Sequence, residues 1–253
     1  MTVEHTTAPG RSLTQPPIER PLWWLQPLTV VMVLGGFTGY AFWSIVIATS
    51  GWEYQNYLSP FYSPLIQLGF WPLSPALLVF AFPLGFRATC YYYRKAYYRS
   101  FFWDPPACAI GELGSVSARA GYRGERRFPN VLLNFHRFFL YAATAVLAFL
   151  WVDTFRAFVF DGRFGIGLGS VIFLVNVVLL SGYTFSCHSL RHLVGGDLDC
   201  FSCSRARYSL WRWVSAISPK HASFAWLSLF TVVLTDIYVR LLSAGVFTEL
   251  RFL

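Results

Sequence analysis

Charged side chains are scarce in this 253-residue sequence. Asp, Glu, Lys and Arg make up 13% of it, whereas the apolar types, counted with Tyr and Cys, make up 55%. So few charges cannot cover the surface of a soluble globule, so the composition predicts a membrane protein. The net charge of +8 could suggest nucleic-acid binding. In a membrane chain, however, basic residues first set topology, and no nucleic-acid partner is predicted.

The N-terminal segment lacks the features of a signal peptide. Residues 1–22 are polar and rich in proline, with no apolar core and no small-residue cleavage site. We therefore expect a cytosolic tail over residues 1–22 and a membrane domain over residues 23–253. The sequence also contains no internal repeat and no low-complexity tract.

Long apolar stretches are what the sequence has in abundance. Crossing the roughly 30 Å of hydrocarbon takes about 20 helical residues, and five stretches are long enough. They cover residues 23–50, 72–97, 129–154, 166–193 and 220–245. Pro83, inside the second stretch, predicts a kink. The predicted fold class is all-α, an integral membrane bundle of five transmembrane helices.

The basic residues are distributed unevenly between the two sides of this predicted bundle. Fourteen Lys and Arg fall in the N-terminal tail and the two long connections, against four in the opposite loops and C-terminal region. Because basic loops stay in the cytoplasm, the N-terminus is predicted to be cytoplasmic and the C-terminus outside. The expected location is the plasma membrane, crossed several times.

Histidine and cysteine are few, five of each, and those outside the tail fall in the predicted cytoplasmic half. The first two apolar stretches contain no histidine, which excludes haem ligation from them and a second haem on the outer side. The cytoplasm is reducing, so we expect no disulfides there. This favours metal ligation as the role of clustered cysteines.

Residues 186–203, SCHSLRHLVGGDLDCFSC, hold the densest group of candidate metal ligands. The four candidates are His188, His192, Cys200 and Cys203. Positions i and i+4 of a helix share one face, so the two imidazoles can converge on one metal. Gly195 and Gly196 let the chain turn back with the two thiolates. Cys187 is a possible substitute ligand.

Three cofactors are candidates for the histidines and cysteines of this chain. Two His and two Cys suit tetrahedral zinc, and they suit a Rieske-type [2Fe-2S] cluster, in which His binds one iron and Cys the other. We prefer the cluster, because membrane helices, basic loops and abundant aromatic residues suit an electron carrier. Haem b between His136 and His221 is the third alternative.

Polar residues at the starts of the third and fifth predicted helices suggest a quinone site. The predicted contacts are His136, Arg137, Tyr141, Lys220 and His221. Such donors can hold quinone oxygens beside apolar and aromatic walls, and an imidazole can supply a proton. Nearer the outer side, Asp236 and Arg240 are predicted to form an intrahelical ion pair.

These features together resemble a known family. Five helices, histidines on the inner side, long basic inner loops, and HSLRH followed by CFSC are similar to the membrane-anchor subunit of succinate dehydrogenase and fumarate reductase, and more narrowly to its actinobacterial, mycobacterial type. The family's two-haem branch carries haem-ligating His on the first two helices. Here those helices have none.

The resemblance implies a subunit of a succinate:quinone oxidoreductase that itself binds no succinate. Its expected partners are a flavoprotein subunit, an iron–sulfur subunit, a further small hydrophobic subunit, lipids and menaquinone, within a higher oligomer of the complex. It would pass electrons through the [2Fe-2S] centre in the respiratory chain. The alternatives are a haem b anchor of the same complex and a zinc-stabilised membrane scaffold or transporter without a redox role.

Overall fold

The computed structural model describes residues 22, 24–101, 130–196, 200 and 203–252. Apart from Leu22, the predicted cytosolic tail lies outside the described residues, and so does most of the first long basic connection. The described chain is mostly helical, as predicted, with two short β-hairpins.

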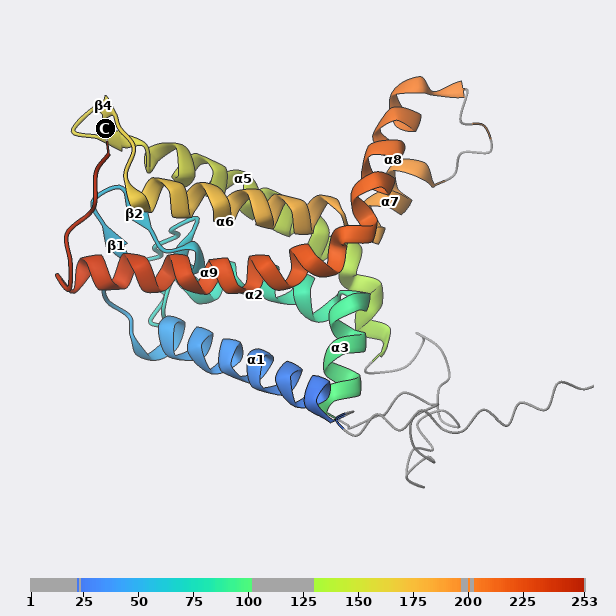
Figure 1. Ribbon diagram of the computed structural model, residues 1–253, viewed down its shortest axis with the longest axis horizontal. Coiled ribbons are helices and arrows are strands. Elements are labelled where there is room, and N and C mark those ends of the chain that lie inside the picture. Colours follow the sequence, from blue (N-terminus) through green and yellow to red (C-terminus); the bar gives the residue numbers. More distant parts are fainter. Residues whose placement is uncertain (1–21, 23, 102–129, 197–199, 201–202, 253) are drawn as a thin grey trace, which may run out of the picture.

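Five helices lie side by side as the body of the molecule (Figure 1). They are α1 (Leu25–Phe42), α2 (Ala76–Thr89), α5 (His136–Arg156), α6 (Leu168–Phe185) and α9 (His221–Ser243). By length and composition, four helices among the described residues could cross a membrane. These four contain α1, α5, α6 and α9. The remaining helix, α2, is apolar but has 14 residues, so it is too short to cross alone.

Short elements gather at both ends of this body (Figure 1). One end, which we call the α7 end, carries the helices α3 (Tyr91–Phe101), α7 (His188–Gly195) and α8 (Arg205–Ile217) and the start of α1. The opposite, C-terminal end carries two hairpins, one from β1 (Glu53–Tyr54) and β2 (Tyr57–Leu58), the other from β3 (Val159–Phe160) and β4 (Arg163–Phe164). The start of α1 and the end of the described chain thus lie toward opposite ends of the bundle (Figure 1).

Two helices predicted to be continuous are each broken at a cysteine. The stretch 72–97 divides into α2 and α3 at Cys90, which has extended backbone angles (φ −62°, ψ 126°). The stretch 166–193 divides into α6 and α7 at Cys187 (φ −66°, ψ 139°). Both single-helix predictions are therefore wrong. Hydropathy measures only the length of an apolar stretch. It does not detect the hydroxyl residue before each break, whose side chain bonds to the preceding helical turn.

The predicted kink proline does not end its helix. Pro83 lies inside α2, which continues to Thr89. The other apolar predictions agree with the structure within a few residues. In particular, α1 is extended by the π-helix η1 (Trp43–Ile47), and α5 is preceded by the 3₁₀ helix η4 (Asn130–Phe135).

Glycines allow close helix contacts near both breaks. A Cβ atom on Gly85 of α2 would lie 2.2 Å from the ring of Phe139 on α5. A Cβ atom on Gly182 of α6 would lie 2.6 Å from the ring of Phe224 on α9. With any larger residue at either position, the facing ring or the helix would have to move. The two glycines therefore help to bring the ends of α2 and α6 against α5 and α9.

A buried ion pair within α9 bonds to hydroxyl groups of α1 and η1 toward the C-terminal end. Arg240 Nε donates to Asp236 Oδ2 at 2.9 Å, and Asp236 is fully buried. Tyr40 and Ser44 donate to the same carboxylate oxygen at 2.5 and 2.9 Å. The predicted i,i+4 pair is thus confirmed, and the structure adds the hydroxyl donors that compensate for its burial.

Candidate functional site

The four ligands predicted from residues 186–203 are not gathered in the structure. His188 and His192 are exposed on α7, and Cys200 is joined to Cys203 by a disulfide with its Cα atoms 5.5 Å apart. Among the described residues, no three His, Cys, Asp or Glu side chains surround a point that could hold a single metal ion. Ligation by this set stays an untested prediction, and its two sulfur atoms are bonded to each other here.

The disulfide differs from the expectation that this side of the protein has none. Cysteines three positions apart come within bonding distance in a tight turn, whatever the compartment. The helix assumption behind the predicted set also fails in part. Because α7 begins at His188 instead of continuing α6, its two histidines leave the bundle with α7.

A different group of two cysteines and two histidines converges inside the α7 end. It consists of Cys90, His136, Cys187 and His221, which we call the break site. His136 Nε2 lies 3.1 Å from Cys187 Sγ, and His221 Nε2 lies 3.4 Å from Cys90 Sγ. Both cysteines belong to one buried core cluster. Three of the four residues are at most 5% exposed, and His136 is partly buried.

The positions of these residues follow from the ends of the helices. The two cysteines are the extended residues at the two helix breaks. The two histidines are the first residues of α5 and α9, each after a 3₁₀ turn: η4 before His136, and η6 (Ser218–Lys220) before His221. Four different helix ends therefore meet at one level of the bundle.

Aromatic rings enclose the break site. Phe86 stacks on His136 with ring centroids 4.7 Å apart, and Tyr183 stacks on His221 at 5.0 Å. Phe86 and Tyr183 in turn meet edge to face at 5.3 Å. The hydroxyl of Tyr183 is buried without an oxygen or nitrogen hydrogen-bond partner, and it interacts with the thiol of Cys90.

Arg87 places a positive charge beside the same rings. Its guanidinium lies 4.6 Å from the centroid of the Tyr183 ring. It donates to Tyr93 Oη at 2.6 Å and to Ser228 Oγ at 2.9 Å. This partly buried guanidinium favours negative charge in the neighbourhood of the break site.

Burial raises the pKa of the Cys187 thiol to about 12. On its own this thiol is therefore neutral at physiological pH. A bound cation reverses that preference, because metal ligation stabilises the thiolate. Burial thus makes this thiol poorly suited to act as a free nucleophile.

The residues predicted to contact quinone fall into two groups. His136 and His221 belong to the break site, with their Nε2 atoms facing sulfur. Arg137 and Tyr141 of α5 and Lys220 of η6 are exposed. Since positions i and i+4 share one helix face, Arg137 and Tyr141 lie on the same side of α5.

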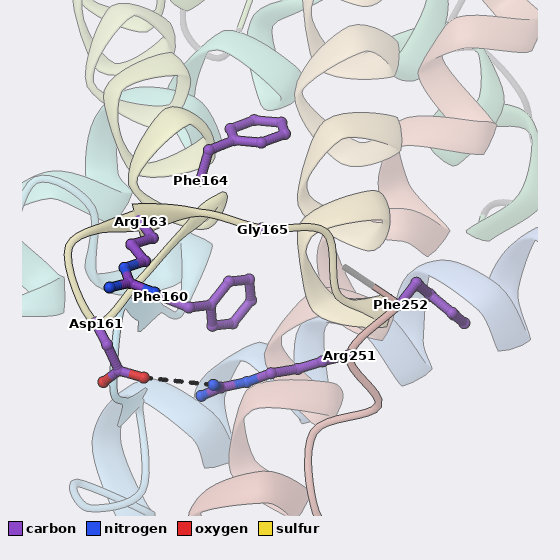
Figure 2. A pocket seen from close by; sticks show the side chains of 7 residues that line it. All are labelled: Phe160, Asp161, Arg163, Phe164, Gly165, Arg251 and Phe252. Carbon is purple, nitrogen blue, oxygen red and sulfur yellow. Dashed lines mark hydrogen bonds and ion pairs between the residues drawn. The ribbon is translucent and has the colours of Figure 1, made fainter.

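Two cavities lie at the other end of the molecule, near the hairpins. One, of about 660 Å³, is formed by the β3–β4 hairpin and the C-terminal residues Arg251 and Phe252. Figure 2 shows Asp161 and Arg251 reaching toward each other across it, 3.5 Å apart. The other, of about 520 Å³, lies between the β1–β2 hairpin and the end of α5. Neither is lined by a residue predicted to bind metal or quinone.

The sequence-based interpretation did not select Cys90 as a candidate ligand and kept Cys187 only as a substitute. A usable signal was present. Both cysteines and both histidines fall near predicted helix ends on the same side of the membrane, where side chains from different helices can meet. The local spacing of HSLRH and CFSC was a more conspicuous signal and directed attention to residues 188–203.

Comparison with known proteins gives two matches. Residues 25–245 match the family model described as actinobacterial succinate dehydrogenase subunit SdhC. A chain of the solved structure described as the Mycobacterium smegmatis Sdh1 complex in the apo form is similar, with a TM-score of 0.81 and 39% sequence identity, over 100% of this chain and 98% of that one. No curated protein matches. The chain belongs to the family of the actinobacterial succinate dehydrogenase subunit SdhC.

Proposed function

We propose that this chain is the membrane anchor of a succinate:quinone oxidoreductase and that its break site holds a Rieske-type [2Fe-2S] cluster that relays electrons to menaquinone. The observation that carries the proposal is the pair of buried contacts between His136 and Cys187 and between His221 and Cys90. When bound, such a cluster supplies one-electron transfer. Its His ligands raise the potential to about −150 to +300 mV, from about −400 mV in plant-type ferredoxins.

The residues fit a two-iron centre better than a single ion. A Rieske-type cluster takes two ligands on each iron, both His on one and both Cys on the other. Each of the two observed contacts joins one His to one Cys. The two His that would bind one iron therefore belong to different contacts, and so do the two Cys that would bind the other. A single zinc ion requires four ligands around one point, an arrangement not found among the described residues.

The neighbouring side chains fit the charge of the same cluster. With two thiolate and two neutral imidazole ligands it is formally neutral when oxidised and gains one negative charge on reduction. Arg87 lies beside the rings that enclose the site and would favour the added electron. The buried Tyr183 hydroxyl, which interacts with the thiol of Cys90, could donate to a sulfur atom.

Partner docking is proposed at the α7 end. Basic residues gather there on three helices: Arg94 and Lys95 on α3, Arg191 on α7, and Arg205 and Arg212 on α8. We place the iron–sulfur subunit on this basic end, with the flavoprotein subunit beyond it. The α7 end then faces the cytoplasm, in agreement with the positive-inside distribution, and the membrane is the plasma membrane.

Lateral contacts are proposed along the membrane-facing sides of the bundle. Large apolar side chains there are exposed, among them Phe138, Phe149 and Phe230. Lipids, a further small hydrophobic subunit and copies of the complex would cover them in a higher oligomer.

The magnetic spectrum of the purified complex tests the cluster assignment. After reduction, we expect an electron paramagnetic resonance signal with hyperfine coupling to directly bound histidine nitrogen. All-cysteine clusters of a partner subunit lack that coupling, so they are distinguished from the break site. A Soret absorption band without the nitrogen-coupled signal would instead support haem b, and zinc without either signal would support the scaffold alternative.

Quinone binding is proposed at the exposed donors beside the break site, Arg137, Tyr141 and Lys220. His136 and His221, which the sequence also suggested, are reassigned to the metal. Replacing Arg137 by glutamine is expected to raise the KM for quinone, or to lower turnover, roughly 10-fold, as for a lost bond to a charged donor.

The matched control is Arg156→Gln, an exposed arginine at the opposite end of the same helix. Succinate oxidation with a soluble dye acceptor should stay normal in both variants. Equal quinone kinetics in the Arg137 and Arg156 variants, with normal assembly, would place the quinone elsewhere.

A further inference from the structure

Each histidine of the break site bonds through its second ring nitrogen to a hydroxyl group. His136 Nδ1 lies 2.9 Å from Thr89 Oγ1. His221 Nδ1 lies 2.8 Å from Ser186 Oγ. Both hydroxyl residues are at most 9% exposed, so bulk water has little access to replace these bonds.

The other hydrogen bond of each hydroxyl decides which atom carries the proton. Thr89 Oγ1 donates to the carbonyl oxygen of Gly85 at 2.7 Å. Ser186 Oγ donates to the carbonyl oxygen of Tyr183 at 3.3 Å. A hydroxyl has one hydrogen, so an oxygen that donates to its carbonyl accepts from the imidazole, and this is the arrangement that we infer at both breaks. Nδ1 of each ring is then protonated, and the lone pair is on Nε2, the atom that faces sulfur.

The two helix breaks are coupled in a crossed pattern. Thr89 directly precedes Cys90, and Ser186 directly precedes Cys187. Thr89 bonds His136, whose other nitrogen faces the cysteine of the second break. Ser186 bonds His221, whose other nitrogen faces the cysteine of the first break. Each imidazole is therefore held between the hydroxyl of one break and the sulfur of the other.

We propose that Thr89 and Ser186 are positioning residues that hold His136 and His221 in the Nδ1-protonated tautomer, so that Nε2 is the ligating nitrogen of both. The inference rests on the proposed cluster. Its physical basis is general, since a metal-bound histidine is oriented by the partner of its other nitrogen. Here that partner is a hydroxyl at each helix break.

Two variants of the complex remove one hydroxyl each, Thr89→Val and Ser186→Ala. Pulsed electron paramagnetic resonance detects the remote, non-ligating nitrogen of each histidine through its quadrupole coupling, which responds to the hydrogen bond at that nitrogen. Each variant is expected to change one of the two remote-nitrogen signals. Retention of the cluster iron against a chelator should also fall about 10- to 100-fold, as for other lost outer-shell bonds.

The controls separate loss of the hydroxyl from general disturbance. Thr89→Ser and Ser186→Thr keep the hydroxyl and should keep both remote-nitrogen signals. Thr144→Val removes a hydroxyl of the same kind on α5, one that donates to Leu140 O at 2.8 Å, and should change neither.

Three outcomes are decisive. Wild-type remote-nitrogen signals in both Thr89→Val and Ser186→Ala would overturn the inference while leaving the cluster in place. Loss of the signals in the hydroxyl-retaining variants as well would also overturn it. A wild-type complex without any nitrogen-coupled signal would instead refute the proposed function itself.

Discussion

Replacement of Cys187 by alanine is expected to remove the nitrogen-coupled iron–sulfur signal and to abolish quinone reduction by the complex. Cys90→Ala should behave in the same way, because both thiols lie 3.1–3.4 Å from an imidazole nitrogen in the buried break site. Losing a direct ligand should cost more than the roughly 10- to 100-fold typical of outer-shell changes. Iron content, the spectrum and quinone-dependent turnover of the purified complex measure the effect.

Cys200→Ala and Cys203→Ala are the matched controls. They alter the disulfide-bonded cysteine pair in the connection between α7 and α8. Both variants should keep the signal and the turnover. Succinate oxidation with a soluble dye should persist in all four variants, because that reaction is assigned to other subunits. If the controls lost the signal while Cys90→Ala and Cys187→Ala kept it, the ligands would be those predicted from residues 188–203.

The second large effect is expected at the opposite end of the bundle, where Arg240→Met should strongly destabilise the protein. Arg240 pairs with the fully buried Asp236 and donates to the carbonyl oxygens of Ser44, Ala48 and Ser50 at 2.8–3.0 Å. Without it, the Asp236 carboxylate loses its counter-ion, and the three carbonyl oxygens lose a donor. Breaking a buried ion pair from one side costs about 3–5 kcal/mol.

Thermal unfolding of the purified complex measures this effect, with Arg251→Met as the control. Arg251 pairs with Asp161 at 3.5 Å, and both side chains are largely exposed, so its loss should cost at most about 1 kcal/mol. The double variant Asp236→Asn, Arg240→Met should recover part of the stability, because no unpaired charge is then buried. Equal shifts for Arg240→Met and Arg251→Met would contradict the structural role of the buried pair.

The Asp236–Arg240 pair also shows where sequence reasoning succeeds. Its spacing of four residues on one helix is a local property, and the predicted contact is present in the structure. The hydroxyl donors Tyr40 and Ser44, more than 190 positions away in the chain, were not predictable by the same rule. Local spacing therefore predicts the ion pair itself but not the hydroxyl donors that stabilise it.

The candidate metal ligands show the opposite case. The local rule that positions i and i+4 share a helix face applied to His188 and His192, and α7 does contain both. It did not reveal that the chain leaves the axis of α6 just before them. The contacts of the break site join residues 51 and 131 positions apart, and no spacing within a segment encodes such pairs.

The amino-acid sequence by itself determined the membrane class, the approximate extent of the apolar helices, and the end of the bundle at which His and Cys collect. It also identified the family, which the comparisons confirm. These properties follow from how individual side chains and short segments interact with water, lipid and charge, and such interactions need no knowledge of the neighbours.

Only the tertiary structure decided which cysteines and histidines meet. Cys90 and Cys187 became candidate ligands because α2 and α6 both end at the same level, and because glycines at 85 and 182 let α5 and α9 approach. The physical reason is that a ligand set depends on the relative placement of four helix ends. That placement is set by packing between helices and by hydroxyls that bond across the breaks, not by the pattern within any one of them.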